Sequence, residues 1–419
     1  PLTMQLNLQK SQLLPILAPH EINRAEEILR NCVHCGFCLA TCPTYQLLGS
    51  ELDSPRGRIY QIKQLMEGKS PTRITQQHLD RCLTCRNCET TCPSGIRFSE
   101  LLDIGRRLTE HHVKRPWLQR MTIQVMRSIL PYRKRITPLI RLGHHLRIPL
   151  ARYQPAKENF PAPEAVAITP TETIILFRGC VQEGLAPATN QSLMALLHQL
   201  GMQVLQPAEE GCCGALSHHL SAPQEAEQFM HNNIEQWLPL VQERAAKVVI
   251  SASGCGVMIK EYGKLLSSDA AIKVSEAAVD PAELLLPYLN RLQAKPGIEK
   301  RVVFHPPCTQ QHGLKTDLIV EQILKSIGFE LLPIKDRHLC CGAAGSYAIL
   351  QKEISYQLRD KKIHSLKQHQ PALIATSNIG CQHHLQQQSK TPVVHWIELL
   401  SIKEGIDPPT ETQACSEVP

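Results

Sequence analysis

The chain has 419 residues, a formal net charge of +7 and 17 cysteines, and its length suggests two to four domains. It has no run of 18 or more apolar residues, which argues against a membrane-spanning helix, and its first residues lack the features of a secretory signal peptide. We therefore expect a reducing, cytoplasmic location. There, patterned cysteines serve as metal ligands or redox groups more often than as disulfides.

Eight of the cysteines lie in two copies of one motif, 50 positions apart. Residues 31–43 read NCVHCGFCLATCP and residues 81–93 read RCLTCRNCETTCP. Both fit C-x2-C-x2-C-x3-C-P, the spacing of bacterial ferredoxins with two [4Fe–4S] clusters. In that arrangement the fourth cysteine of each run reaches the partner cluster, whereas zinc ribbons and disulfides, the alternatives, do not need it. The predicted ligand sets are Cys32, Cys35, Cys38 and Cys92 for one cluster, and Cys82, Cys85, Cys88 and Cys42 for the other.

Two predicted helices accompany these motifs. Residues 21–31 have apolar side chains at helical spacing. Further along, Ser54 is a predicted N-cap and Pro55 the first residue of a helix that continues to about residue 67. This helix would place Arg56 and Arg58 near the clusters, where their charge offsets that of the thiolates. A solvated basic face is the alternative.

Eight further cysteines form a second duplication with a different spacing. The runs TIILFRGC, KVVISASGC, RVVFHPPC and ALIATSNIGC are apolar, end on a cysteine, and predict buried parallel strands. Helical stretches alternate with them, so each copy is expected to be an α/β module with its cysteines at the strand ends. With offsets of 128, 128, 128 and 126 residues, the set Cys180, Cys212, Cys213 and Cys255 recurs as Cys308, Cys340, Cys341 and Cys381.

Three roles are open for these two CCG repeats, named after their Cys-Cys-Gly element: further iron–sulfur clusters, a structural zinc, or redox-active thiols. We favour binding of a cluster or a metal, because the glycine leaves room for close approach and a following helix offers N–H donors to thiolates. Reduced structural cysteines in a duplicated scaffold are the alternative. We interpret the neighbouring His305, His338 and His383 as structural, and Cys415 as a free thiol in the tail.

Two ferredoxin motifs followed by two CCG repeats resemble the glycolate oxidase iron–sulfur subunit family. Related families are the iron–sulfur subunits of anaerobic glycerol-3-phosphate dehydrogenase, lactate utilisation and heterodisulfide reductase. The resemblance covers roughly residues 20–405 and is carried by VHCGFCLATCPTY, ELDSPRGRIY, HLDRCLTCRNCETTCPSG, ASGCG and TSNIGCQ. It implies an electron-transfer subunit that is not catalytic alone. Such a subunit takes electrons from flavoprotein subunits that oxidise glycolate to glyoxylate, or D-lactate to pyruvate, and passes them to the respiratory chain, with a quinone as the expected acceptor. An iron–sulfur subunit for lactate or glycerol-3-phosphate oxidation is an alternative.

The sequence departs from the fuller CCG pattern, which ends in C-x2-C. Ala252 and Asn378 stand where that pattern has its additional cysteine, so each repeat offers four cysteines rather than five. This weakens the alternative of a heterodisulfide reductase-like thiol–disulfide oxidoreductase. The chain also has no G-x-G-x-x-G fingerprint, so we expect no flavin in this chain and hydride chemistry in its partners.

A basic segment separates the two halves. Residues 101–157 carry 13 Lys or Arg and two acidic residues, and residues 115–135 combine basic positions with apolar ones at helical spacing. This pattern favours an interfacial helix on anionic lipid, peripheral on the plasma membrane, or a surface that docks a partner subunit. A helix packed on its own domain is the alternative. Nucleic acid is not expected, because no groove-reading module is present.

The sequence therefore predicts an α+β chain, with an N-terminal helical di-cluster ferredoxin domain followed by two α/β CCG repeats with parallel strands. The Pro-rich stretch 150–173 is the predicted linker. The expected organisation is a ferredoxin-like domain at 1–110, the basic segment and linker at 111–172, the first CCG repeat at 173–295, the second at 296–405, and a tail at 406–419.

Overall fold

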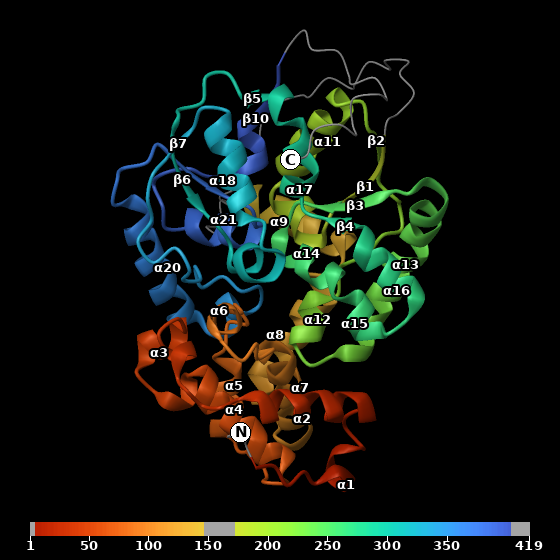
Figure 1. Ribbon diagram of the computed structural model, residues 1–419, viewed down its shortest axis with the longest axis vertical. Helices are drawn as coiled ribbons and strands as arrows, with labels where there is room; N and C mark the ends of the chain where they lie inside the picture. Colours follow the sequence, from red (N-terminus) through yellow and green to blue (C-terminus); the bar gives the residue numbers. More distant parts are fainter. Residues whose placement is uncertain (1–4, 146–171, 404–419) are drawn as a thin grey trace.

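The computed structural model describes residues 5–145 and 172–403. Figure 1 shows helices of the N-terminal third at one end of the molecule and the two CCG repeats side by side at the other. Most of the predicted linker, and the tail with Cys415, lie outside the described residues. Within the described part of the chain, no helix has the length and apolar character needed to span a membrane.

In the N-terminal part, residues 6–108 form helices around one apolar core that includes Ile22, Ile62 and Leu101, whereas the helix of residues 133–145 contacts the first CCG repeat. The predicted start of the second long helix is confirmed, because Ser54 Oγ accepts a hydrogen bond from Gly57 N at 2.9 Å and Pro55 is the first helical residue. The helices are α1 (Lys10–Leu13), α2 (Pro19–Asn31), η1 (Phe37–Leu39), α3 (Pro43–Leu48), η2 (Glu51–Asp53), α4 (Pro55–Met66), α5 (Arg73–Asp80), α6 (Asn87–Thr91), α7 (Phe98–His112), α8 (Trp117–Ile129) and α9 (Arg133–His145).

The first CCG repeat contains a parallel sheet in the order β2-β1-β3-β4, as its apolar runs predicted. The strands are β1 (Thr173–Phe177), β2 (Gln203–Leu205), β3 (Lys247–Ile250) and β4 (Ala278–Val279). The helices are α10 (Cys180–Leu185), α11 (Pro187–Gln199), α12 (Ala215–His219), α13 (Pro223–Arg244), α14 (Ser253–Lys260), α15 (Tyr262–Leu266), α16 (Asp269–Ala277), α17 (Pro281–Leu285) and η4 (Leu286–Arg291).

The second CCG repeat has the corresponding parallel order, β7-β6-β8-β9. Its strands are β6 (Arg301–His305), β7 (Glu330–Leu331), β8 (Leu373–Thr376) and β9 (Val393–His395). Its helices are η5 (Thr309–Leu314), α18 (Asp317–Ser326), α19 (Tyr347–Leu350), α20 (Lys352–Lys367), α21 (Ile379–Gln386) and η6 (Trp396–Leu399). A separate antiparallel pair joins β5 (Leu292–Ala294), which precedes this repeat, to β10 (Leu400–Ile402), which follows it.

The two sheets share one apolar core. Leu176 and Val249 of the first sheet belong to the same buried cluster as Val302 and Phe304 of the second. The duplicated modules therefore bury their apolar surface against each other, and the cysteine-bearing loops of both repeats lie near the ferredoxin part (Figure 1).

Candidate metal centres

The structure brings the predicted ferredoxin cysteines together in two pockets. The fourth cysteine of each run lines the pocket formed by the first three cysteines of the other run, as the crossed ligation of this motif requires. The two runs also share their backbone turns, since His34 and Thr84 both have φ of 53° and Gly36 and Arg86 are both left-handed. One pocket is lined by Cys32, Cys35, Cys38 and Cys92, and the other by Cys42, Cys82, Cys85 and Cys88.

The two pockets are neighbours that differ in exposure. Pro55, Cys88 and Phe98 line both of them. The first pocket opens near the surface, because Cys35 is exposed and Phe37 is 63% exposed. The eight cysteines of the two runs thus line two adjacent pockets, and eight cysteine sulfurs are the number of ligands that a pair of [4Fe–4S] clusters requires.

Arg58 lies behind the second pocket and is fully buried. Its guanidinium donates to the carbonyl of His78 at 2.7 Å and to Thr44 Oγ1 at 3.1 Å, and it pairs with Asp53 Oδ1 at 3.4 Å. Thr44 Oγ1 in turn lies 3.3 Å from Cys42 Sγ. The alternative of a solvated basic face is therefore wrong for Arg58, which places a buried positive charge close to the cysteines.

Arg56 lies at the first pocket, as expected, and donates to the carbonyl of His34 at 3.3 Å. Burial raises the pKa of the Cys38 thiol to about 11 and also raises the pKa of Cys32, while Arg56 acts in the opposite direction on both. Because a thiolate is the ligand form, loading of this pocket releases protons, and the nearby arginine favours that release.

In the first CCG repeat, the four cysteines meet at the carboxyl ends of β1 and β3. Cys180 Sγ lies 3.6 Å from Cys212 Sγ, and the Cys213 thiol contacts that of Cys255. Asn233 of α13 is fully buried and donates to the carbonyl of Cys212 at 2.8 Å, which fixes the loop. The helix expected after the CCG element is confirmed, because α12 begins immediately after it.

The second CCG repeat gathers its cysteines in the same way. Cys308 Sγ lies 3.9 Å from Cys340 Sγ, and Cys341 Sγ lies 3.2 Å from Cys381 Sγ, too far for the disulfide length of about 2.05 Å. Gly342 has φ of 89°, and a Cβ there would lie 2.5 Å from a backbone oxygen of α20, so no larger residue fits. Here the next helix, α19, begins only at Tyr347, later than expected.

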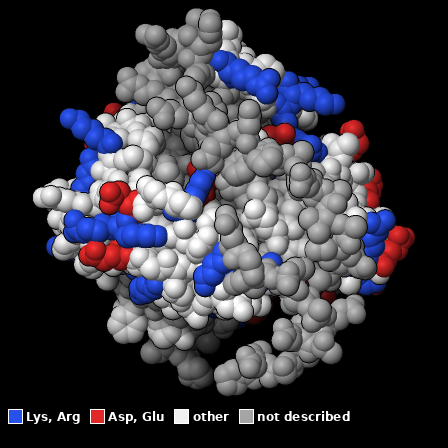
Figure 2. Space-filling view, turned by 90° about the horizontal axis from the view of Figure 1, so that it is seen from above, with Lys and Arg blue, Asp and Glu red and all other residues white. Residues whose placement is uncertain are grey.

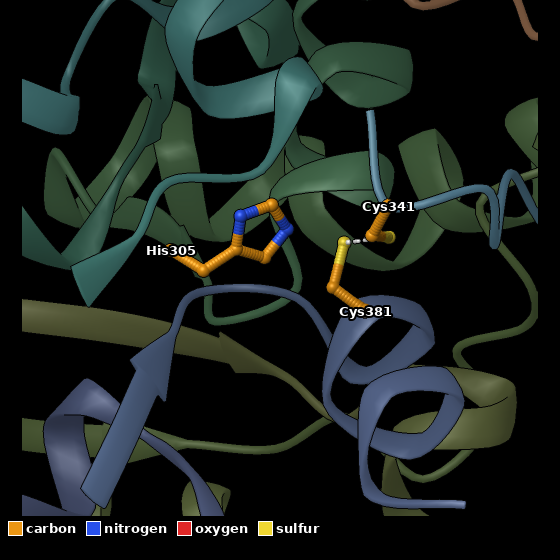
Figure 3. Close-up of side chains that lie close together, drawn as sticks. All are labelled: His305, Cys341 and Cys381. Carbon is orange, nitrogen blue, oxygen red and sulfur yellow. Dashed lines mark hydrogen bonds between the residues drawn. The ribbon is translucent and has the colours of Figure 1, made fainter. Parts of the chain in front are cut away.

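His305 completes this second group. It is the last residue of β6, only 1% exposed, and one of its ring nitrogens and the sulfurs of Cys341 and Cys381 lie within 4.8 Å of one another (Figure 3). Burial holds its pKa well below the usual value, so the imidazole is neutral. The sequence interpretation as a structural histidine missed this arrangement. The available signal was that the corresponding position of the first repeat is Phe177, a difference between otherwise matching strands.

Lys362 of α20 adds a buried cation to the second repeat. It is 3% exposed, and its Nζ donates to the carbonyls of Asp336 at 2.9 Å and Arg337 at 3.3 Å. Burial lowers the pKa of its ammonium to about 8, although the nearby cysteines act against that shift. The positive charge next to the thiols favours their ionised, ligand-competent form.

Comparison with known proteins matches this architecture. The chain fits the 4Fe-4S dicluster domain family over residues 28–96 and the cysteine-rich domain family over residues 174–260 and 302–386. It is 46% identical over 384 residues to the glycolate oxidase iron-sulfur subunit of Escherichia coli (strain K12), covering 90% of this chain and 94% of that protein. The chain belongs to the family of glycolate oxidase iron–sulfur subunits.

A second relative agrees with this assignment, and one solved structure shares the fold. The probable glycolate oxidase iron-sulfur subunit of Bacillus subtilis (strain 168) is 30% identical over 390 residues, which cover 84% of this subunit and 87% of that protein. The crystal structure of a hypothetical protein from Helicobacter pylori shares the fold, with a TM-score of 0.53, 10% identity, and coverage of 93% of this subunit and 73% of that chain. This chain is therefore an iron–sulfur electron-transfer subunit of an oxidoreductase with a ferredoxin-type and a cysteine-rich part.

The second pocket of the iron–sulfur subunit lies directly against the second CCG repeat. Cys85 packs in one buried cluster with Cys308, Cys340 and Tyr347. The Tyr347 hydroxyl donates to the carbonyl of Arg81 at 3.0 Å, across the same junction. No local sequence pattern predicts this contact, because residues more than 200 positions apart meet there.

The first repeat is tied to the ferredoxin part by charge. Asp103 of α7 lies 3.2 Å from His218 Nε2 and 3.4 Å from His219 Nδ1, both on α12. Burial by itself would raise the pKa of Asp103, but the two imidazoles outweigh it and hold that pKa well below its usual value. Burial would lower the pKa of His218, and the Asp103 carboxylate more than reverses this, so that pKa is raised.

We expect this link to contribute most between about pH 4 and about pH 6.5, where Asp103 is ionised and His218 is protonated in both the folded and the unfolded chain. Its contribution fades as the pH rises through the folded pKa of His218, and as it falls through the folded pKa of Asp103. Asp103→Asn should lower the melting temperature of the loaded subunit more at about pH 6 than at about pH 9. Asp360→Asn, at a carboxylate that is 55% exposed, is the control. An equal loss at both pH values would contradict the prediction.

Proposed function

We propose that this subunit receives electrons from flavoprotein partner subunits that oxidise glycolate to glyoxylate, and passes them towards a respiratory quinone. The observation that carries the proposal is the pair of adjacent four-cysteine pockets, in a chain 46% identical to a glycolate oxidase iron-sulfur subunit. D-lactate is the alternative substrate, because lactate-utilisation proteins are among the relatives of this chain. The alternative with a different reaction type is a thiol–disulfide activity like that of heterodisulfide reductase.

We further propose the ligand sets predicted from the motif, with Cys92 reaching the first pocket and Cys42 the second. The [4Fe–4S] clusters supply one-electron transfer when bound there. Phe98 and Pro55 are buried, line both pockets and contribute apolar surface to each of them. Arg58 compensates part of the thiolate charge at the second pocket, which favours its reduced state.

The exposure of the sites supports an order of electron transfer. Cys35 and Phe37 face solvent at the first pocket, so a partner subunit docks closest to that pocket. Cys85 at the second pocket packs against Cys308 and Cys340. We therefore propose a path from the first pocket to the second pocket and from there to the second CCG repeat.

An anaerobic experiment tests this function. The subunit is co-purified with the proteins encoded beside it, glycolate is added, and the EPR signal of reduced clusters is recorded. A signal with glycolate supports the proposal, whereas a signal with D-lactate alone would identify D-lactate as the substrate in place of glycolate. Silence with both, together with thiol release from a disulfide substrate that Cys340→Ser abolishes, would replace the proposal by the disulfide alternative.

The segment α8–α9 supports a second proposal, binding of the subunit to an anionic lipid surface. Trp117, Leu118, Met121 and Val125 are each between 49% and 68% exposed. At 3.6 residues per turn they fall within an arc of about 100° on α8, and the one buried residue of that helix, Met126, lies on the opposite face. The exposure of these four side chains supports an interfacial helix over the alternative of a helix whose apolar face packs on its own domain.

The charges around the stripe favour anionic lipid over a neutral surface. The exposed basic residues of α8 and α9 are Arg120, Lys134, Arg135 and Arg141, and the exposed Lys114 precedes α8. Figure 2 views the end of the molecule away from the ferredoxin part, where both basic and acidic side chains are seen among the described residues. An exposed Trp beside aliphatic and basic side chains is typical of a helix at a membrane interface.

Tryptophan fluorescence tests lipid binding directly. The chain has three tryptophans, of which Trp237 and Trp396 are buried, so a change on vesicle binding reports Trp117. We expect a blue shift and co-sedimentation with phosphatidylglycerol vesicles but not with phosphatidylcholine vesicles. Met121→Asp should abolish both, whereas Leu318→Asp, at a side chain 67% exposed on α18, should retain them. If Met121→Asp instead releases the flavoprotein partners and leaves vesicle binding unchanged, the stripe docks a subunit and not a membrane.

A further inference from the structure

The two CCG repeats differ at one position that the strand pairing makes equivalent. Phe177 ends β1 and lies opposite Ile250 of β3, and His305 ends β6 and lies opposite Thr376 of β8. Each stands three residues before the first cysteine of its repeat. In the first repeat this position is an ordinary core residue, because the ring of Phe177 packs edge-on against Trp237 at 5.6 Å. An imidazole in the same place needs another explanation.

His305 is buried without a protein partner for either ring nitrogen. A buried polar group without a hydrogen bond costs about 1–3 kcal/mol. The fold satisfies a comparable histidine elsewhere, since His395 is also fully buried, but its Nε2 lies 3.0 Å from the carbonyl of Ser251 and its Nδ1 accepts from Ile397 N at 3.3 Å. The isolation of His305 therefore points to a ligand that the protein itself does not supply.

The geometry around His305 fits a metal. One of its ring nitrogens and the sulfurs of Cys341 and Cys381 lie within 4.8 Å of one another, and the sulfurs are 3.2 Å apart. Metal–sulfur bonds of about 2.3 Å and metal–nitrogen bonds of about 2.0 Å place tetrahedral ligand atoms about 3.5–3.8 Å apart. The sulfur–sulfur distance of 3.2 Å is slightly shorter than this range, and the ring nitrogen is at most 4.8 Å from either sulfur, so the three ligand atoms are close enough to share one metal after small side-chain rotations. Figure 3 shows the imidazole and the two thiols gathered from three different segments of the repeat.

Asn378 does not provide a further ligand at this site. Its Oδ1 accepts from Gly380 N at 2.8 Å, and its Nδ2 donates to Ser253 Oγ at 3.1 Å. Both ends of the amide are thus used to cap α21 and to join the repeats. The remaining donors of the second repeat are the sulfurs of Cys308 and Cys340, next to Cys341. His305 therefore supplies a donor in addition to the four cysteines.

We propose that His305 is a ligand of the metal centre of the second CCG repeat, bound through a ring nitrogen beside the thiolates of Cys341 and Cys381. The second site is then a mixed imidazole–thiolate site, whereas the first offers thiolates alone. Iron in a cluster and zinc both accept this donor set. A neutral imidazole adds a donor without adding negative charge, so an iron centre is easier to reduce than it would be with a further thiolate in that position. The proposal rests on metal binding by the second repeat and not on the identity of the substrate.

Metal analysis and nitrogen spectroscopy test this ligation on the complete, anaerobically purified subunit. The variant His305→Phe copies the residue of the first repeat, His305→Cys keeps a ligand, and His395→Phe is the matched buried histidine. Iron, zinc and sulfide per chain are measured for each. Protein labelled with ¹⁵N-histidine is examined by pulsed EPR if the site holds iron, and by X-ray absorption at the zinc edge if it holds zinc.

We expect a histidine nitrogen bound to the metal in the unchanged subunit and in His395→Phe, and its loss in His305→Phe. Metal content should fall in His305→Phe and be restored in His305→Cys, which separates loss of a ligand from misfolding. An unaltered nitrogen signal and metal content in His305→Phe would overturn the proposal. So would unchanged metal content in Cys341→Ser/Cys381→Ser, which would show that the second repeat holds no metal, while glycolate-dependent reduction of the ferredoxin clusters could persist.

Discussion

Cys92→Ser is expected to remove the cluster at the pocket of Cys32, Cys35 and Cys38, although Cys92 belongs to the other cysteine run. The reason is that Cys92 lines that pocket, and in the proposed crossed assignment its thiolate is the fourth sulfur ligand of the cluster there. We expect a loss of up to about four iron atoms per chain, and the disappearance of one of two reduced-cluster EPR signals.

The reciprocal variant is the control. Cys42 lines the pocket of Cys82, Cys85 and Cys88, so Cys42→Ser should affect the other EPR signal and leave the first intact. Each variant should also give the same EPR spectrum as a variant of another cysteine in the pocket that it is proposed to serve. For Cys92→Ser, this comparison is Cys35→Ser. A Cys92→Ser spectrum that matches that of Cys85→Ser instead would refute the crossed assignment.

Asp53→Ala is expected to destabilise the loaded subunit by about 3–5 kcal/mol. Asp53 is fully buried and accepts from Arg58, His78 and Arg81, so its removal leaves the buried guanidinium of Arg58 without its carboxylate. The free energy of unfolding is measured by anaerobic denaturant titration, with iron release as a second readout, because Arg58 lines the second pocket.

Glu26→Ala provides the comparison for this effect. Glu26 pairs with Arg30 along α2 at 2.8 Å, but both side chains are partly exposed, so the pair is worth less than about 1 kcal/mol. If Asp53→Ala and Glu26→Ala lowered the free energy of unfolding by similar amounts, the buried ion pairs around Arg58 would contribute no more to stability than an exposed pair.

Features that depend on residues close together in the sequence could be predicted, whereas features that depend on contacts between distant segments could not. The ferredoxin cysteines have fixed local spacing, and β1 and β6 are short β-branched apolar runs, so motif and strands were recognisable. The burial of Arg58 could not be predicted, because a charged residue near a helix N-terminus normally faces water. Its burial depends on contacts with Asp53 and with the carbonyl of His78.

The junction and the second CCG site depended on contacts that no local pattern encodes. A single histidine has no spacing that marks it as a ligand, and the isolation of His305 from protein partners arises only when β6, the CCG loop and α21 come together. Likewise, Cys85 meets Cys308 because two distant segments pack, and neither motif contains information about the other.

The antiparallel pairing of β5 with β10 makes the duplicated half a single cooperative unit. β10 follows the second repeat in the sequence, yet it returns to the strand that leaves the first, and the sheets bury Leu176 and Phe304 in common. Neither module then has a complete apolar interior when separated from its copy. Gene duplication has thus left two halves that depend on each other for stability, so that residues such as Phe177 and His305 can diverge chemically while the shared interior holds both in place.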